Sequence, residues 1–254
     1  RHLAIGTAQP TEKEQQGAPH HLYGIREPGD PISAGEYAHL VKEKIDEIEA
    51  RGNLPIICGG SGLYFRALTK GIFNESTTDM HLREKLTKRL AKEGAEVLLA
   101  ELEKVDPDYA EIVHPNNHKR LIRALEIFEM TGLPPTEHFR QQRENNPDDV
   151  QLFVAYLRPE MEWLDKRIVR RTDELFALGW IDEVKKLLEK GYSKSTHPMD
   201  SLGYGEIMNY LEGKFDFDEI VAQINLKSRH YAKKQISWFN KERVNYVLQI
   251  STDE

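Results

Sequence analysis

Regularly spaced apolar residues mark a first helix near the start of the chain. Between Ala34 and Ala50, apolar side chains recur along one helical face, mostly every three or four positions. They are Tyr37, Leu40, Val41, Ile45 and Ile48. Ser33 stands where an N-cap hydroxyl belongs, and Gly52 follows the last apolar position. We therefore predict an amphipathic helix over Ala34–Ala50.

A short, continuous apolar run follows this helix. Leu54–Cys58 is typical of a strand that is buried on both faces of a parallel sheet. The glycine turn Gly59–Gly62 comes next, followed by the helical stretch Leu63–Leu68. This order predicts an α/β unit, whose ligands bind beyond the carboxyl ends of the strands, where the glycine turn lies. Cys58 is the only cysteine, so it forms no internal disulfide, and its apolar neighbours predict a buried core thiol.

The pattern between Thr78 and Gly132 is helical throughout. Apolar residues recur at helical spacing in three groups, and Gly94 and Gly132 stand where helices would stop. The groups are Leu82, Leu86 and Leu90, then Val97, Leu98 and Leu102, then Leu121, Leu125 and Phe128. These helices predict a helical insertion, which we place at residues 73–140.

The sequence returns to alternating strand and helix patterns after this insertion. The polar stretch from Arg140 to Asp149 predicts a loop, and Leu152–Leu157 predicts a core strand. Helical patterns follow, and Tyr246–Ile250 predicts a last strand. We therefore expect an α/β fold with a parallel sheet core from residues 1–72 and 141–254, and a mostly helical C-terminal part.

Composition and charge narrow the classes of function. No apolar run is long enough to span a membrane, so we expect a cytoplasmic protein. The net charge of −7 argues against attraction of nucleic acid to the whole surface, so RNA contacts would need local basic patches. One patch lies between residues 227 and 243, where six basic residues accompany the single acidic residue Glu242. The basic residues are Lys227, Arg229, Lys233, Lys234, Lys241 and Arg243.

Aromatic residues are interleaved with this positive charge. Together with the basic residues, Tyr231, Trp238 and Phe239 give the combination that holds phosphates and stacks on unpaired bases, although Trp238 and Phe239 are equally compatible with core positions.

The glycine turn is a second candidate site, because Gly59, Gly60 and Ser61 offer backbone N–H groups and a hydroxyl at a helix N-terminus. A purely steric need for glycine in a tight turn is an equal alternative.

Two arginine-rich helices and one glycine-bearing segment complete the candidates. Lys119, Arg120 and Arg123 lie in the first turns of a helix, where positive charge is unfavourable because it opposes the helix dipole. A polyanion that binds at this end would explain the placement. A solvated basic face is the alternative. Arg167, Arg170 and Arg171 could hold a diphosphate, but helix-surface ion pairs with Asp165 or Glu174 are favoured on spacing alone. The segment from Met199 to Gly205 could bind a base edge or form a capped loop.

Seven motifs, in order along nearly the whole chain, resemble those of bacterial tRNA dimethylallyltransferases. They are IGTAQPT, GAPHHL, GGSGLYFRAL, HPNNHKRLIRALEIF, the pair RIVRRTDEL and GWIDEVKKL, SLGYGEI and RHYAKKQISWF. The resemblance implies a core like that of P-loop NTPases with a helical insertion. It also implies transfer of dimethylallyl from dimethylallyl diphosphate to N6 of adenosine-37 in the tRNA anticodon stem-loop, with Mg²⁺, by a monomer.

The resemblance also implies roles for individual residues. Arg171 corresponds to an arginine that binds the diphosphate. Two isolated positions, Ser61 and Arg83, correspond to residues that contact tRNA, the serine replacing a more usual threonine. Two segments correspond to further tRNA contacts: Lys119, Arg120, Leu121, Ile122 and Arg123, then Met199, Asp200, Ser201, Leu202, Gly203 and Tyr204. Gly59, Gly60, Arg167, Arg229 and Lys233 are further possible RNA or phosphate contacts, and no residue of the sequence is predicted to bind a metal.

Two motifs that the resemblance implies are not found in the sequence. A phosphate loop of the form GxTxxGKT and a DSxQVY segment, which carries the aspartate general base, should precede Arg1. The one Gly-Lys pair, Gly213-Lys214, is followed by Phe215 and fits no phosphate loop. We expect a further N-terminal stretch, because a sheet without its first strand has an unpaired edge. The alternatives are a P-loop-type small-molecule kinase and an inactive protein that binds the anticodon loop.

Overall fold

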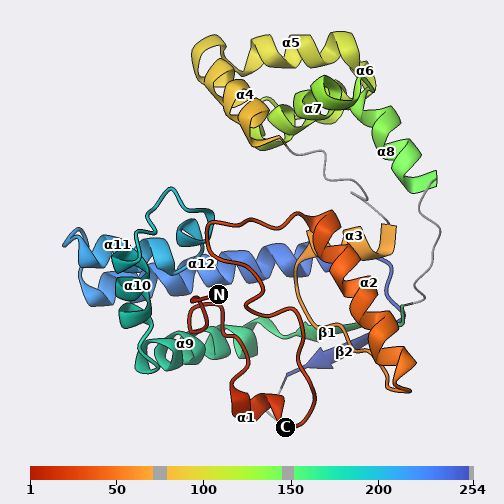
Figure 1. The fold of residues 1–254 in the computed structure, drawn as a ribbon. Coiled ribbons are helices and arrows are strands. Elements are labelled where there is room, and N and C mark those ends of the chain that lie inside the picture. Colours follow the sequence, from red (N-terminus) through yellow and green to blue (C-terminus); the bar gives the residue numbers. More distant parts are fainter. Residues whose placement is uncertain (71–78, 145–151, 252–254) are drawn as a thin grey trace. The chain divides into compact units, whose positions relative to one another are not determined.

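The computed structural model describes residues 1–70, 79–144 and 152–251, and the chain divides into two compact units (Figure 1). The sheet unit comprises residues 1–32, 44–62 and 152–254, and the helical unit comprises residues 33–43 and 63–151. Helix α2 (Ala34–Ala50) and helix α3 (Gly62–Lys70) each contribute residues to both. We describe each unit by itself.

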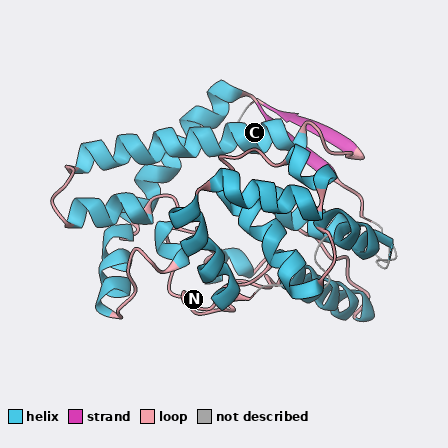
Figure 2. Ribbon diagram, turned by 90° about the horizontal axis from the view of Figure 1, so that it is seen from above, coloured by secondary structure: helices cyan, strands magenta, loops and turns pink. Residues whose placement is uncertain are grey.

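The sheet unit contains two parallel strands and the longest helices of the described chain. Its elements are α1 (Glu12–Gln15), β1 (Ala155–Pro159), α9 (Met161–Ala177), α10 (Trp180–Glu189), the 3₁₀ helix η1 (His197–Asp200), α11 (Tyr204–Leu211), α12 (Phe217–Phe239) and β2 (Tyr246–Ile250). The strands pair in register from Ala155 with Tyr246 to Pro159 with Ile250, and Figure 2 shows them side by side. Parallel strands need a crossover, which is supplied here by the helices between them. The predicted α/β class is confirmed.

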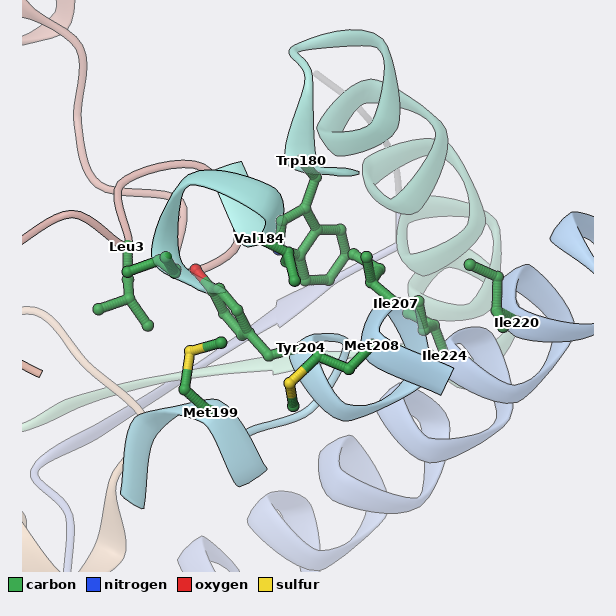
Figure 3. Packing of buried hydrophobic residues seen from close by; sticks show 10 residues of the cluster. Leu3, Trp180, Val184, Met199, Tyr204, Ile207, Met208, Ile220 and Ile224 are labelled. Carbon is green, nitrogen blue, oxygen red and sulfur yellow. The ribbon is translucent and has the colours of Figure 1, made fainter. Parts of the chain in front are cut away.

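The core of the sheet unit lies between α10, α11 and α12 (Figure 3). The Trp180 ring is buried and meets the Tyr204 ring edge-on, with 5.7 Å between the ring centroids. Aliphatic side chains and methionines surround this pair: Leu3, Val184, Leu187, Met199, Ile207, Met208, Ile220 and Ile224. Leu3 belongs to this core, although its other buried members all lie beyond residue 179, so the start of the chain is fixed against these helices.

The helical unit has a separate core. Helices α4 (Met80–Glu93), α5 (Ala95–Val105), α6 (Pro107–Ile112), α7 (His118–Thr131) and α8 (Pro135–Glu144) follow one another along the chain. Five of the leucines that the apolar pattern singles out converge here and are fully buried, and Leu82 and Leu90 are partly buried against them. The five are Leu86, Leu98, Leu102, Leu121 and Leu125. Side chains cap the N-termini of three helices, with Asp79 before α4, Asp106 before α6 and Asn117 before α7. Gly132 ends α7 in the left-handed conformation, as predicted for a stop.

Several predicted elements are confirmed. Helix α2 has the predicted bounds, and the Ser33 hydroxyl accepts a hydrogen bond from the backbone N–H of Glu36 at 3.1 Å. Helix α3 contains the predicted stretch Leu63–Leu68, and β2 covers Tyr246–Ile250. The strand expected over Leu152–Leu157 is present as β1, but it runs from Ala155 to Pro159. The predicted insertion bounds stay a prediction, and residues 72 and 73 lie outside the described part of the chain.

The prediction of a buried strand over Leu54–Cys58 is wrong. No strand forms there, and the side chain of Leu54 is 83% exposed. An apolar run becomes a strand only where neighbouring strands supply hydrogen bonds, and the described sheet pairs β1 with β2 alone. Cys58 is exposed for the same reason, so the predicted buried thiol is also wrong.

The loop predicted from Arg140 onward is wrong for its first residues. Helix α8 continues through Glu144, because the Arg140 guanidinium bridges one carboxylate on each side of it. Arg140 donates to Glu137 and to Glu144, each at 2.7 Å, across the three- and four-residue spacings that stabilise exposed helices. This pairing lowers the pKa of Glu137 to about 2. Residues 145–149 of the predicted loop lie outside the described residues.

Candidate functional site

The glycine turn of the sheet unit packs closely against α12. The side-chain amide of Gln235 donates to the carbonyl of Gly60 at 2.8 Å. A Cβ on Gly60 would lie 2.3 Å from Gln235, and a Cβ on Gly62 would lie 2.5 Å from the Trp238 ring. Sterics therefore require glycine at position 62, because a ring cannot move aside as easily as the flexible end of Gln235 can at Gly60, whereas Gly59 has open space around it. Ser61, between them, is exposed, so its hydroxyl is available to a ligand.

The basic patch of α12 divides into paired and exposed residues. The ammonium of Lys227 pairs with Glu206, and the guanidinium of Arg229 lies 3.1 Å from Asp165 on α9. Lys233 and Lys234 are exposed, and Tyr231 is also exposed between the paired and the exposed cations. Trp238 and Phe239 are half-buried, and Phe239 stacks on Tyr156 of β1 with 5.7 Å between the centroids. The two rings are therefore packing residues, and Tyr231 is the exposed aromatic residue of this patch.

The three arginines of α9 have different surroundings. The Arg167 guanidinium lies over the Trp163 ring at 4.9 Å, and Arg170 forms an ion pair with Glu174 at 3.5 Å. Arg171 is exposed, and no acidic side chain among the described residues pairs with it. Ion pairing on the helix surface, which the spacing favours, thus accounts for Arg170. An exposed guanidinium without an internal partner is available to an anionic ligand, so Arg171 remains the candidate for the diphosphate.

The segment 199–204 contains both buried and exposed residues. Met199, Gly203 and Tyr204 are buried, Leu202 is half-buried, and Asp200 and Ser201 are exposed. Gly203 has a φ of 91°, and a Cβ there would lie 1.9 Å from the Trp180 ring, so both conformation and space require glycine. The buried members fix the segment, and the exposed Asp200 and Ser201 are the side chains it offers to a ligand.

A buried carboxylate, Glu183, joins this segment to the start of the chain. It accepts hydrogen bonds from the backbone N–H groups of Ile5 at 2.7 Å and Gly6 at 3.1 Å. The Tyr204 hydroxyl also donates to it, at 2.7 Å. Burial, together with this hydrogen bond, raises the pKa of Tyr204 far above its ordinary value. Glu183 therefore holds the IGTAQPT motif and the SLGYGEI motif in one arrangement.

Neither Glu183 nor the similar Glu206 was predicted as a site residue. Glu206 accepts from the backbone N–H of Gly203 at 2.7 Å and pairs with Lys227, so it links the same segment to α12. The sequence gives one indication that Glu183 is buried, which is its place on the apolar face of α10 with Trp180 and Val184. A carboxylate that is buried on such a face needs hydrogen-bond donors, but the apolar pattern does not predict which residues donate.

A comparable cluster lies in the helical unit, between α4 and α7. The Glu126 carboxylate accepts from the guanidinium groups of Arg83 at 2.7 Å and Arg123 at 2.8 Å. The backbone N–H of Asp79, the N-cap of α4, donates to the same carboxylate at 3.1 Å. The structure thus brings together two of the predicted tRNA-binding residues, Arg83 and Arg123, through an acidic residue that was not predicted.

The rest of the α7 segment divides by burial. Lys119 and Arg120 are exposed at the N-terminus of the helix, and the Arg120 guanidinium lies over the Tyr109 ring at 5.9 Å. Leu121 and Ile122 are buried in the core of the helical unit. The side chains that α7 presents to a ligand are therefore basic, and the role of the segment in tRNA binding stays a prediction.

The described residues show neither a metal site nor a membrane helix. No three of their His, Cys, Asp and Glu side chains gather where they could hold a metal ion. The Mg²⁺ that the resemblance implies therefore lacks a ligand set made of protein side chains alone in this part of the chain. Within the same residues, no helix has the length and apolar character that crossing a membrane requires.

Comparisons with known proteins point to one family. The sequence model of the family described as IPP transferase matches residues 1–242. The chain is 43% identical to tRNA dimethylallyltransferase 1 of Trichlorobacter lovleyi over 244 residues, which is 95% of this chain and 79% of that protein. Many further curated proteins match as well, including a tRNA dimethylallyltransferase of Thermotoga petrophila at 40% identity, covering 98% of this chain and 80% of that protein.

A solved structure agrees with these sequence matches. The tRNA isopentenylpyrophosphate transferase of Bacillus halodurans superposes with a TM-score of 0.67 at 34% identity, covering 99% of this chain and 78% of that chain. The sequence and structural matches both extend across the sheet unit and the helical unit. The sheet unit and the helical unit therefore both belong to the part of the chain that is shared with these relatives.

Proposed function

The chain belongs to the IPP transferase family, and we propose that it transfers a dimethylallyl group from dimethylallyl diphosphate to N6 of adenosine-37 in tRNA. The observation that carries this proposal is the family match through residue 242, which covers nearly all the described residues. Relatives of 43% and 40% identity bear the name tRNA dimethylallyltransferase. The predicted family and reaction are thereby supported over the kinase alternative.

The reaction has three requirements. The N6 atom of adenine attacks the first carbon of the dimethylallyl group, and the bond from that carbon to oxygen breaks. Diphosphate leaves with the electron pair of that bond, and a carboxylate takes the N6 proton. Catalysis therefore needs cations for the leaving group, a base for the proton and a pocket for a base that has left the anticodon stack.

The exposed Arg171 is our proposal for the leaving-group requirement. Its guanidinium offers a planar set of donors that match phosphate oxygens, and no described acidic side chain competes for it. We propose that Ser61, exposed on the glycine turn, contacts the acceptor nucleotide. The proton would pass to the aspartate of the DSxQVY segment that the resemblance implies. No step is assigned to Glu183, because it is buried and its carboxylate is already engaged by three donors.

Both units offer tRNA-binding surfaces of their own. In the sheet unit we propose the exposed Asp200, Ser201 and Lys233, and in the helical unit the exposed Lys119 and Arg120. Phosphate contacts from such lysines and arginines give binding that weakens steeply with salt. Local basic patches of this kind reconcile RNA binding with the net charge of −7.

The remaining expectations concern cofactor, assembly and location. We propose that the protein acts as a monomer in the cytoplasm and that transfer depends on Mg²⁺. Mg²⁺ usually keeps several waters and binds substrate phosphates with only one or two carboxylates, so a cage of protein ligands is not required. Light scattering during gel filtration tests the monomer, and transfer assays with a chelator, then with Mg²⁺ restored, test the ion.

A transfer assay tests the proposed function. The protein is incubated with isotope-labelled dimethylallyl diphosphate and a tRNA that has adenosine at position 37, and label in RNA is measured with released diphosphate. We expect equal amounts of both products, and none with a matched tRNA that has guanosine at that position. Stem-loop binding without transfer would favour the inactive binding protein, and phosphoryl transfer from ATP to a small molecule would favour the kinase.

A further inference from the structure

The carboxylate of Glu126 is a buried charge that the proposed mechanism does not use. Its side chain is fully buried, with 0% exposure, whereas Arg83 is 38% exposed and Arg123 is 21% exposed. Its three donors come from two helices: the Asp79 N–H and the Arg83 guanidinium from the start of α4, and the Arg123 guanidinium from α7. One acidic residue thus fixes two partly exposed cations 40 positions apart in the sequence.

Charge balance separates this cluster from an ordinary buried ion pair. A buried carboxylate must be compensated, and one guanidinium with good geometry is enough for that. Glu126 has two, so the cluster of Arg83, Arg123 and Glu126 carries a net positive charge, with the negative group inside and both cations reaching the surface. Such an arrangement places two partly exposed guanidinium groups on one buried carboxylate.

We propose that Glu126 is a positioning residue for RNA: it holds Arg83 and Arg123 together so that both bind the phosphate backbone of the tRNA. This inference rests on the proposed function, which supplies the RNA. Exposed Lys119 and Arg120 lie on the same helix, four and three positions before Arg123, so the three cations of α7 are neighbours on the helix surface. Two long side chains lose considerable rotamer freedom when they bind a phosphate, and a shared carboxylate removes part of that cost beforehand.

The substitution Glu126→Gln distinguishes the positioning of the two arginines from the overall charge of the surface, because these two effects change the affinity for RNA in opposite directions. Removing a negative charge beside two arginines makes the surface more positive, which by itself strengthens attraction to RNA. Both guanidinium groups donate to Oε2 of Glu126, and the Asp79 N–H donates to Oε1. The amide of glutamine has one neutral acceptor oxygen and one donor group, so both hydrogen bonds to the arginines lose their charge, and either the arginines or the Asp79 N–H must face the NH₂ group. We expect the loss of position to dominate because it acts on direct phosphate contacts, whereas the extra charge is buried behind them.

The experiment measures binding of a labelled anticodon stem-loop and steady-state transfer with the same protein. For Glu126→Gln we expect roughly tenfold weaker binding, because the hydrogen bonds that hold both arginines become weaker when their acceptor loses its charge. The slope of log Kd against log salt should become shallower by about one phosphate contact. KM for tRNA should rise by a similar factor, with kcat at saturating tRNA unchanged. In a background of Arg83→Ala with Arg123→Ala, Glu126→Gln should weaken binding no further.

Asp106 provides a matched structural control. It is a buried carboxylate in the same unit, and it accepts from the backbone N–H groups of Tyr109 at 3.0 Å and Thr136 at 2.6 Å and from the Thr136 hydroxyl at 3.0 Å; among the described residues, no arginine pairs with it. Asp106→Asn should lower the thermal stability while the folded protein keeps its RNA affinity. Unchanged or tighter binding by Glu126→Gln, or an undiminished loss in the double-alanine background, would overturn the inference while leaving the transferase proposal intact. Stem-loop binding without transfer in the parent protein would overturn the transferase proposal alone.

Discussion

Three buried glutamate carboxylates connect parts of the predicted motifs that are distant in the sequence. Glu183 connects two backbone N–H groups near the start of the chain with the hydroxyl of Tyr204, across 178 positions of sequence. Glu206 and Glu126 act in the same way on Gly203 and on Arg83. The exposed site residues were predictable from residue type and spacing. Their buried partners were not, because a carboxylate on an apolar helix face indicates that donors exist and not where they lie in the sequence.

The hydroxyl of Tyr204 gives a pH-dependent contribution to stability. Its pKa is raised in the folded protein, so the folded state keeps the phenolic proton at pH values where the unfolded state loses it. The stabilisation is therefore complete below about pH 10, the ordinary value, and falls by roughly 1.4 kcal/mol per pH unit above it. Tyr204→Phe should be about 1–2 kcal/mol less stable at pH 7 and should lack this component. Urea unfolding of both proteins between pH 7 and 11 measures the difference, and parallel curves would contradict it.

Arg171 and Arg170 allow a comparison of neighbouring residues on α9. Arg171 has no described acidic partner, whereas Arg170 pairs with Glu174 at 3.5 Å. Arg171→Ala should lower kcat/KM for dimethylallyl diphosphate by about 100-fold, since one lost donor to a leaving group typically has that effect. Arg170→Ala should change this value little, because the Arg170 guanidinium is already paired with Glu174 on the exposed surface of the helix. Equal losses in the two variants would contradict the role of Arg171.

At the scale of elements, predictions succeed where the local sequence decides the structure. Helix α2 has its predicted bounds because apolar spacing, the Ser33 cap and Gly52 agree. The run Leu54–Cys58 fails because a strand depends on partners that its own sequence does not contain. Helix α8 exceeds its prediction because ion pairs of Arg140 outweigh a polar, loop-like composition.

The glycine turn contains one position where an added carbon clashes and one where it does not. Gly62→Ala would place a Cβ 2.5 Å from the Trp238 ring, so the turn or α12 must shift, at a cost of about 1–3 kcal/mol. Gly59→Ala adds the same carbon where nothing lies within 4 Å and should leave stability nearly unchanged. Thermal unfolding of the two variants measures the contrast. Similar melting temperatures would show that α12 does not pack on Gly62 as described.

At the scale of the whole molecule, the motifs and the apolar pattern of the sequence predict the family, the α/β class and the helical region. The family rests on motifs spread along the chain, so no single misassigned strand affects it, and the match through residue 242 covers both units. The net charge of −7 would by itself have argued against RNA. Function here depends on how a few cations are grouped within each unit, and total charge does not describe that grouping.

Locating the transferred group on its acceptor tests the central claim most directly. After reaction with dimethylallyl diphosphate, the tRNA is digested to nucleosides and short fragments, and mass spectrometry locates the added group. We predict one dimethylallyl group on N6 of adenosine-37 and no modification of other adenosines. An unmodified adenosine-37 under conditions where the protein binds the stem-loop, or a group attached elsewhere, would contradict the account.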